Sequence, residues 1–511
     1  MIPSAAGVST ANTAPMTKLA DSRLPAGIAL ILCVGLSTTV AAQGERLVDL
    51  ARRQDRAGVR VLVASRADVN VAQPDGATAL HWAAHWDDVE MAALLLRAGA
   101  RVDAANDFGV TPLLLASGNG RPAIIALLLE AGADPNLAAA SGEVPLMTAA
   151  RAGSLEAVDA LLDRGAEVNY KAPGHGQSAL MWAISERHST VARRLVERGA
   201  DIRARSAGGY TPLLFAARVG DLESAKMLVA AGADVNDKTP DETSALLVAV
   251  LRGHTEFAIH LLERGADPNA SAPGYTALQW ASGSWETELT GPNGIDAQGA
   301  EEWRSLAGVP RGKIELIKAL LARGADPNAR LAKPPPRVGY TQLSIEHRVV
   351  GVNPYPGATP FLLAAMAGDV DVMRVLADNG ADPRLASNDG TTPLMVAAGL
   401  GRYLAESRVT EVRALATVKL ALELGGDINA VNDSGNAALH GAAQTKANTV
   451  IKFLAERGAD LSLRNKRGQT ALMIADTVRA GSATVSQKTP TGDLLRSLGA
   501  ESAPAGPTNR E

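Results

Sequence analysis

Residues 206–236 read SAGGYTPLLFAARVGDLESAKMLVAAGADVN, and one complete structural unit can be followed through them. Gly208 and Gly209 suit a tight turn, because glycine adopts positive φ at little steric cost. Thr211 and Pro212 suit the start of a helix, since threonine is a good N-cap and proline a good first helical residue. The stretch therefore begins with a turn that leads directly into a helix.

The remainder of the stretch predicts two short antiparallel helices. The first, LLFAAR, ends at Gly220, and the second, LESAKMLVA, is stopped by Gly232 as a left-handed C-cap. Two helices and a turn cannot bury their apolar faces alone, whereas stacked copies of them can. This unit therefore predicts a repeat protein.

The unit recurs along the chain. A phrase close to Gly-Ala-Asp-x-Asn returns every 33 residues where the copies are undisturbed, as at Gly99, Gly132 and Gly165. A second phrase, Gly-x-Thr-Pro/Ala-Leu, follows it at a fixed offset and stands at 76–80, 109–113, 209–213, 274–278, 390–394 and 468–472. Two phrases in one register predict about eleven stacked units.

These phrases closely resemble the ankyrin repeat, from residue 45 to about residue 500. The resemblance implies an all-α solenoid of stacked helix-turn-helix units with short turn or hairpin fingers. It also implies protein binding through a concave face built from finger tips and the exposed side of the first helices. The helix-opening histidine of the family pattern survives at His81 and His440, and Glu242 replaces the turn glycine of the sixth copy.

The N-terminus has the pattern of a secretory signal. Lys18 and Arg23 precede an apolar run over residues 26–36, which is too short to span a bilayer comfortably. We expect cleavage after Ala42 and a periplasmic or secreted chain without a stable membrane span. Met16 is an alternative start that opens a better basic region than Met1. An uncleaved anchor, and a misassigned start that leaves a floppy leader instead of a signal, remain alternatives.

The repeat pattern sets the other boundaries. We expect a signal peptide over residues 1–42, an N-terminal capping unit over 43–72, the repeat array over 73–500 and a disordered tail over 501–511. Three adjacent copies carry insertions, which the period places near 284–313, 331–356 and 401–413. Insertions in repeat arrays map to loops, often on the binding face, although neutral surface loops are an equal alternative. Trp285 and Trp303 in the first insertion favour a function.

Composition and motifs argue against several classes of function. The formal net charge is −4 with acidic and basic residues interspersed, so we expect no nucleic-acid partner. His81 and His85 lie one helical turn apart, but the family pattern gives His81 a structural role, and we expect no metal and no cofactor. Since no phosphate loop, nucleophile elbow or catalytic Cys/His pair occurs, we predict that the chain is not an enzyme.

The contact residues can be chosen by position in the repeat. Carrying the family's concave face over residue by residue selects aromatic residues at turn tips and two residues on first helices: Phe108, Tyr210, Tyr275, Tyr355, Trp86 and Arg218. Aromatic residues and arginine are common hot-spot types at interfaces. Another aromatic set occupies one shared helical slot, where packing and recognition remain alternatives: Trp82, Trp182, Phe215 and Trp280.

The sequence thus predicts an exported, monomeric scaffold that binds a partner protein through its concave face and finger loops. A chaperone-like stabiliser of an exported enzyme is the alternative from another class, and an enzyme built on the inserted loops is a further one. The sequence does not name the partner.

Overall fold

The computed structural model describes residues 46–271, 274–283, 312–333, 356–401, 409–480 and 483–501. The predicted signal peptide and tail lie outside these residues, as do the central parts of the three insertions. The chain divides into two compact units, Met1–Asp201 and Ile202–Glu511, which are called unit 1 and unit 2 below.

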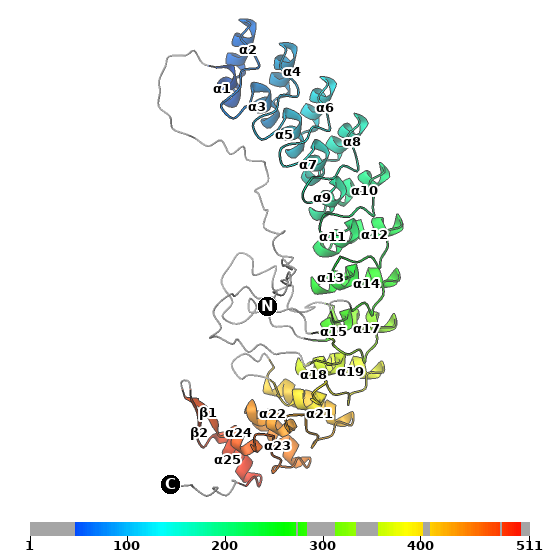
Figure 1. Cartoon of the computed structure of the whole chain (residues 1–511), viewed down its shortest axis with the longest axis vertical. Helices are drawn as coiled ribbons and strands as arrows, with labels where there is room; N and C mark the ends of the chain where they lie inside the picture. The colour runs from blue at the N-terminus through cyan, green and yellow to red at the C-terminus, as the bar shows by residue number, and fades with distance from the viewer. Residues whose placement is uncertain are drawn as a thin grey trace, which may run out of the picture. The chain divides into compact units, whose positions relative to one another are not determined.

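Unit 1 is a stack of helix pairs. Odd-numbered helices pack on one another in a first-helix row and even-numbered helices in a second-helix row (Figure 1). The helices are α1 (Leu47–Arg52), α2 (Arg56–Ala64), α3 (Ala79–His85), α4 (Val89–Arg97), α5 (Pro112–Gly118), α6 (Pro122–Glu130), α7 (Pro145–Ala152), α8 (Leu155–Asp163), α9 (Ala179–Ser185) and α10 (Ser189–Glu197).

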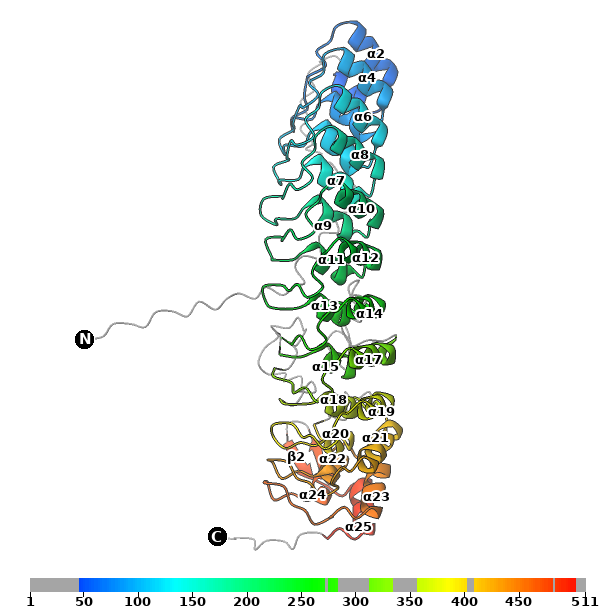
Figure 2. The same cartoon turned by 90° about the vertical axis from the view of Figure 1, so that its right-hand side faces the viewer.

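Unit 2 repeats this arrangement, and in both units the finger loops project to one side of the helix pairs (Figure 2). Its first helices are α11 (Pro212–Val219), α13 (Ala245–Leu251), α15 (Ala277–Ser282), α18 (Pro360–Met366), α20 (Pro393–Ala397), α22 (Ala438–Gln444) and α24 (Ala471–Ala475). Its second helices are α12 (Leu222–Ala230), α14 (Thr255–Glu263), α17 (Lys313–Ala322), α19 (Val370–Asp378), α21 (Glu411–Glu423), α23 (Asn448–Glu456) and α25 (Pro490–Ser497). The predicted all-α stack of helix-turn-helix units is confirmed.

The helix ends follow the sequence signals, with one exception. Gly220 caps α11 with a φ of 70°, and the Asp221 carboxylate caps α12 by accepting a hydrogen bond from the Ser224 amide at 3.1 Å. Thr211 holds the N-cap position of α11 as predicted, but its hydroxyl makes no capping bond there. In the equivalent place of an earlier repeat, the Thr111 hydroxyl accepts from the Leu114 amide at 3.2 Å. Proline at the first helical position therefore starts α11 without help from the threonine side chain.

The turn of the sixth copy keeps its shape without glycine. Glu242 has a φ of 64°, close to the 77° of Gly209 at the equivalent position. A left-handed conformation is unfavourable for a residue with a Cβ atom. Hydrogen bonds within the same finger accompany this conformation: the Glu242 amide donates to the Thr239 carbonyl at 2.8 Å, and the Thr243 amide donates to the Thr239 hydroxyl at 3.0 Å.

Alanine lets the first helices pack closely. Ala83, Ala116 and Ala149, each one period apart, are fully buried on α3, α5 and α7. Larger apolar side chains from the second helices, such as Leu95 and Leu128, are also fully buried. Full burial of a leucine stabilises a fold by about 1.5–3 kcal/mol relative to exposure. Contacts between neighbouring repeats thus replace a single large core.

Asparagine side chains link seven of the repeats to the repeat that follows. The side-chain NH2 of Asn136 donates to the Gly165 carbonyl at 3.0 Å, and its side-chain oxygen accepts from the backbone amide of Glu167 at 2.8 Å. The same pair of bonds is made by Asn70, Asn169, Asn236, Asn269, Asn328 and Asn429. Asp103 takes this position in the second repeat and only accepts, from the Asp134 amide at 3.1 Å.

A two-stranded hairpin interrupts the last repeat. Strands β1 (Thr477–Ala480) and β2 (Ala483–Ser486) pair antiparallel, with Val478 opposite Val485. The sequence analysis did not predict this hairpin. Each strand contains a threonine next to a valine, and β-branched residues favour extended pairing, so the missed signal is local β propensity.

Candidate protein-interaction surfaces

The residues chosen as contacts differ in exposure. Trp86 is 41% exposed and Phe108 61% exposed, whereas Tyr210 and Arg218 are partly buried. Tyr275 is only 4% exposed, so its ring is covered rather than open on the turn tip. The sixth candidate, Tyr355, lies outside the described residues.

The position of each aromatic residue relative to the turn glycine explains this difference. Phe108 precedes Gly109, and its ring faces solvent. Tyr210 and Tyr275 follow their turn glycines, which brings each ring onto the aromatic residue five positions later. The ring centroids of Tyr210 and Phe215 lie 6.1 Å apart in an edge-on arrangement, and those of Tyr275 and Trp280 lie 5.8 Å apart. These two tyrosines therefore pack within their own repeats.

Burial of the tyrosines has an electrostatic consequence. It raises the pKa of the Tyr275 hydroxyl to about 12, and the nearby Asp241 carboxylate adds to the shift. The pKa of Tyr210 is also raised, mainly by burial and further by Asp241, while Arg218 and Arg252 oppose the shift. Both hydroxyls stay neutral in ordinary conditions and can donate a hydrogen bond.

The shared helical slot is a packing position with basic residues over its rings. Trp82, Phe215 and Trp280 are each 4% exposed, and Trp182 is partly buried. The Arg52 guanidinium lies 5.6 Å from the Trp82 ring centroid, which is cation–π distance. Similar contacts join Arg151 to Trp182 at 4.7 Å and Arg218 to Phe215 at 5.2 Å. Burial supports the packing alternative for the rings.

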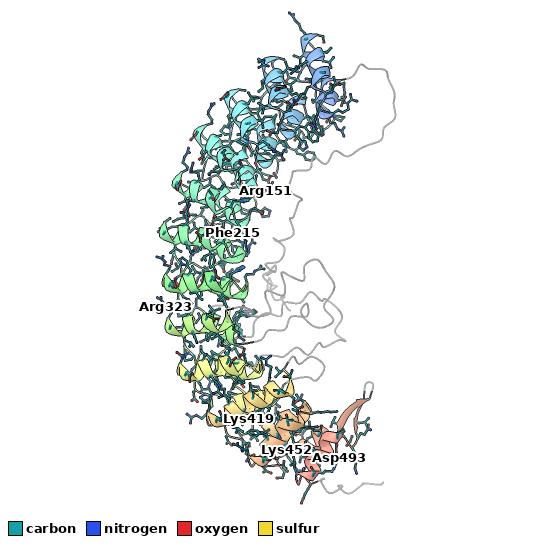
Figure 3. The ribbon with its side chains drawn as sticks, turned by 180° about the vertical axis from the view of Figure 1, so that it is seen from behind. Arg151, Phe215, Arg323, Lys419, Lys452 and Asp493 are labelled. Carbon is teal, nitrogen blue, oxygen red and sulfur yellow. The ribbon has the colours of Figure 1, made fainter. Side chains whose placement is uncertain are left out.

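Two of these arginines were missed by the sequence analysis. Arg52 and Arg151 lie in the last turn of the first helix of the repeat before their aromatic partners, and Figure 3 shows Arg151 on the first-helix side of unit 1. The sequence signal for them is an arginine in the last turn of a first helix, about one repeat before an aromatic residue of the shared slot.

Trp86 lies in a fixed aromatic cluster in unit 1. Its ring stacks on Trp82 with centroids 6.3 Å apart and meets the His85 ring edge-on at 4.6 Å. Its indole N–H donates to the Arg52 carbonyl at 3.2 Å. These contacts fix the side chain while two fifths of its surface stays open.

His81 has the structural role that the family pattern implies. Its Nδ1 accepts from the Thr78 amide at 3.1 Å, and its Nε2 meets the Val110 carbonyl of the next finger at 2.9 Å. Burial lowers the pKa of His81, so the ring stays neutral. At the equivalent position in unit 2, Gln279 also accepts from the amide of its N-cap residue, Thr276, and its second bond goes to the Ala329 carbonyl, at a different position of the next repeat.

The described parts of the chain hold no cluster for a metal ion and no helix that could cross a membrane. Among those residues, no group of three or more histidine, cysteine, aspartate or glutamate side chains is placed to hold a metal ion. Over the same residues, no helix has the length and apolar character needed to cross a membrane.

Known proteins match parts of the chain. The E3 ubiquitin-protein ligase KEG of Arabidopsis thaliana is 33% identical over 129 residues, which is 25% of this chain and 6% of that protein. The chain thus matches only a small part of this relative. The solved human ASB11 ankyrin repeat domain is 26% identical and aligns with a TM-score of 0.40, covering 44% of this chain and 99% of that one.

The family model that describes ankyrin repeats, three copies at a time, matches residues 47–139, 137–206, 213–288, 307–410 and 408–478. These matches contain most of the phrases that carried the resemblance, and that resemblance is confirmed. Because they span more than half of the chain, the protein belongs to the ankyrin repeat family.

Proposed function

We propose that the protein is an exported, non-enzymatic scaffold that binds a partner protein. Ankyrin repeats generally mediate protein–protein interactions, and the stacked fold is typically a binding scaffold rather than an enzyme. One observation in unit 1 carries the proposal. Two large aromatic side chains, Trp86 and Phe108, keep 41% and 61% of their surface exposed on the first-helix and finger side. Aromatic residues of this kind are enriched among interface hot spots.

Rigid aromatic side chains reduce the cost of binding. Association must offset the loss of side-chain freedom, about 0.5–1.5 kcal/mol for each flexible side chain that becomes immobilised. Trp86 already loses this freedom in the free protein, through its stacking on Trp82 and its hydrogen bond to Arg52. A partner that covers Trp86 would gain apolar contact without that entropic cost.

Site-specific cross-linking in cells tests the proposal. A photoreactive amino acid replaces Phe108 in one variant and Val61 in the other. Val61 is the matched control, because it is 67% exposed but belongs to α2 in the second-helix row. We expect one discrete protein adduct at position 108 and none of the same mass at position 61. The absence of an adduct at position 108, or the same adducts at both positions, would refute the proposal.

Export is a separate part of the proposal, supported by the basic start and apolar run before Ala42. Intact-mass measurement of protein from the cell envelope should give a chain that begins just after Ala42. A functional pool in the cytoplasm that retains the leader would contradict export while leaving partner binding open.

A further inference from the structure

The finger loops of unit 1 carry a surplus of negative charge. These loops are residues 67–77, 100–110, 133–143 and 166–177, here called the unit 1 finger face. They contain seven carboxylates, namely Asp68, Asp75, Asp103, Asp107, Asp134, Glu143 and Glu167, against two basic residues, Arg101 and Lys171. The surplus exceeds the net charge of −4 of the whole chain, so the acidic character is concentrated here.

Ion pairing leaves most of this charge uncompensated. Among the described residues, Glu143 is the one carboxylate of the seven with a basic group within ion-pair distance, the Arg151 guanidinium at 3.9 Å. Asp103 and Asp134 belong to adjacent fingers, and the Asp103 carboxylate accepts from the Asp134 amide. The pKa of Asp103 is raised, first by burial and also by the neighbouring Asp134 charge. The fold therefore holds like charges together on this face.

Phe108 lies within the acidic loops and is held from both sides. Its carbonyl accepts from the Ala140 amide of the next finger at 2.9 Å, and Asp107 donates its amide to the Asp75 carbonyl of the previous finger at 2.9 Å. The Asn106 side chain accepts from the Phe108 amide at 3.0 Å. An exposed ring is thus presented on a backbone that three hydrogen bonds fix, next to Asp75 and Asp107.

We propose that the unit 1 finger face docks a segment of a partner protein that is rich in lysine or arginine, with Phe108 as its apolar anchor. Basic side chains suit both parts of this surface. Their charges are attracted to the carboxylates, while their alkyl stems and cationic heads pack on an aromatic ring. The inference rests on the proposed function as a protein-binding scaffold and specifies the chemistry of the partner.

The test uses short random peptides displayed on phage and selected on the immobilised full chain. We expect the enriched peptides to carry a clear excess of lysine and arginine. Binding of the best synthetic peptide should weaken about tenfold or more in Phe108→Ala, as for removal of a hot-spot side chain. In the double variant Asp75→Asn/Asp107→Asn, binding of this peptide should weaken about threefold. The loss of affinity should be smaller at high salt, because screening weakens charge attraction.

A matched pair of substitutions separates a local effect from a change in net charge. Glu130→Gln with Glu156→Gln removes the same two charges from exposed positions of α6 and α8, in the second-helix row. This control should leave the affinity within about twofold, and the melting curves of all variants should superimpose. Asparagine at position 75 preserves the acceptor for the Ala77 amide, so the finger should keep its shape.

Three outcomes would overturn the inference: no enrichment, enrichment of peptides without basic excess, or an equal loss of affinity in the control pair. They can be distinguished from failure of the proposed function. A cross-linked partner at position 108 whose contact segment is not basic refutes the inference alone. Without any cross-linked partner at that position, the proposed function is refuted as well.

Discussion

Replacement of Asp103 by asparagine should stabilise the protein, although it alters no apolar contact. Seven asparagines hold the equivalent position in other repeats, and each uses both ends of its amide to bond to the next repeat. Their donor distances to the glycine carbonyl lie between 2.8 and 3.2 Å. An ionised carboxylate lacks the donor, so Asp103 keeps only the bond from the Asp134 amide.

The size of the effect follows from the bond that is added. A typical intramolecular hydrogen bond contributes about 0.5–1.5 kcal/mol net. The substitution also removes a partly buried charge that lies near Asp134. We therefore expect Asp103→Asn to raise the free energy of unfolding by about 1 kcal/mol at neutral pH. The reciprocal control, Asn136→Asp in the next repeat, should lower it by a similar amount.

The gain should depend on pH with a defined sign. The pKa of Asp103 is higher in the folded chain than its ordinary value of 3.8. The folded wild type therefore holds this proton more tightly than the unfolded chain, and it gains stability as pH falls through the folded pKa. A protonated carboxyl can also donate a hydrogen bond, as the amide does. The advantage of Asp103→Asn should be largest at neutral pH and shrink in acid.

Urea unfolding of both variants and the wild type, at neutral and at acidic pH, measures these differences in the free energy of unfolding. Only differences between chains are compared, which cancels titrations common to all of them. If Asp103→Asn were no more stable than the wild type at neutral pH, or if its advantage did not change with pH, the role assigned to the asparagine bonds would be refuted. Fluorescence of the tryptophans in unit 1 should report the transition nearest the substitution.

Three further substitutions test other parts of the structure. His81→Gln should keep the fold, because Gln279 at the equivalent position also bonds to the amide of its N-cap residue and to a carbonyl of the next repeat. The substitution should also remove a loss of stability in acid. The folded pKa of His81 lies below its ordinary 6.5, so its contribution is complete above that pH and lost as pH falls below it. Melting curves on both sides of that pH check this. Tyr275→Ala should destabilise by about 3 kcal/mol, as for removal of a buried aromatic side chain, whereas Phe108→Ala should change stability by less than about 0.5 kcal/mol. Equal urea midpoints for these two would contradict the assigned burial. Glu242→Gly should stabilise by about 1 kcal/mol, because glycine tolerates the left-handed conformation, and an unchanged or lower midpoint would count against strain at that turn.

The repeat pattern made the fold predictable because it combines many weak local signals in one register. Turn glycines, threonine or proline at helix starts, and apolar spacing agree in copy after copy, as at Gly209, Pro212 and Gly220. Each signal is local, and the stacking that follows from them is between near neighbours in sequence. The hairpin at 477–486 was missed because it occurs once, so no other copy could support its weaker signal.

The candidate surface was less predictable, because exposure is a property of neighbours. Phe108 and Tyr275 were selected by the same positional rule, yet one ring faces solvent and the other packs on Trp280. Phe108 stands one position before its turn glycine, and Tyr275 stands one position after its own. Trp86 remained exposed while Trp82, one helical turn earlier, is buried beneath Arg52.

The sequence by itself determined the repeat family, the helix boundaries and the places where the period is interrupted. These depend on local conformational preferences and on apolar periodicity, which residues express wherever the chain places them. Only the tertiary structure decided which aromatic rings are open, where the arginines lie over them, and how neighbouring fingers bring Asp75 and Asp107 next to Phe108. These features depend on contacts between side chains, some within one repeat and others about a repeat apart, and the packing of the helices and fingers sets those contacts.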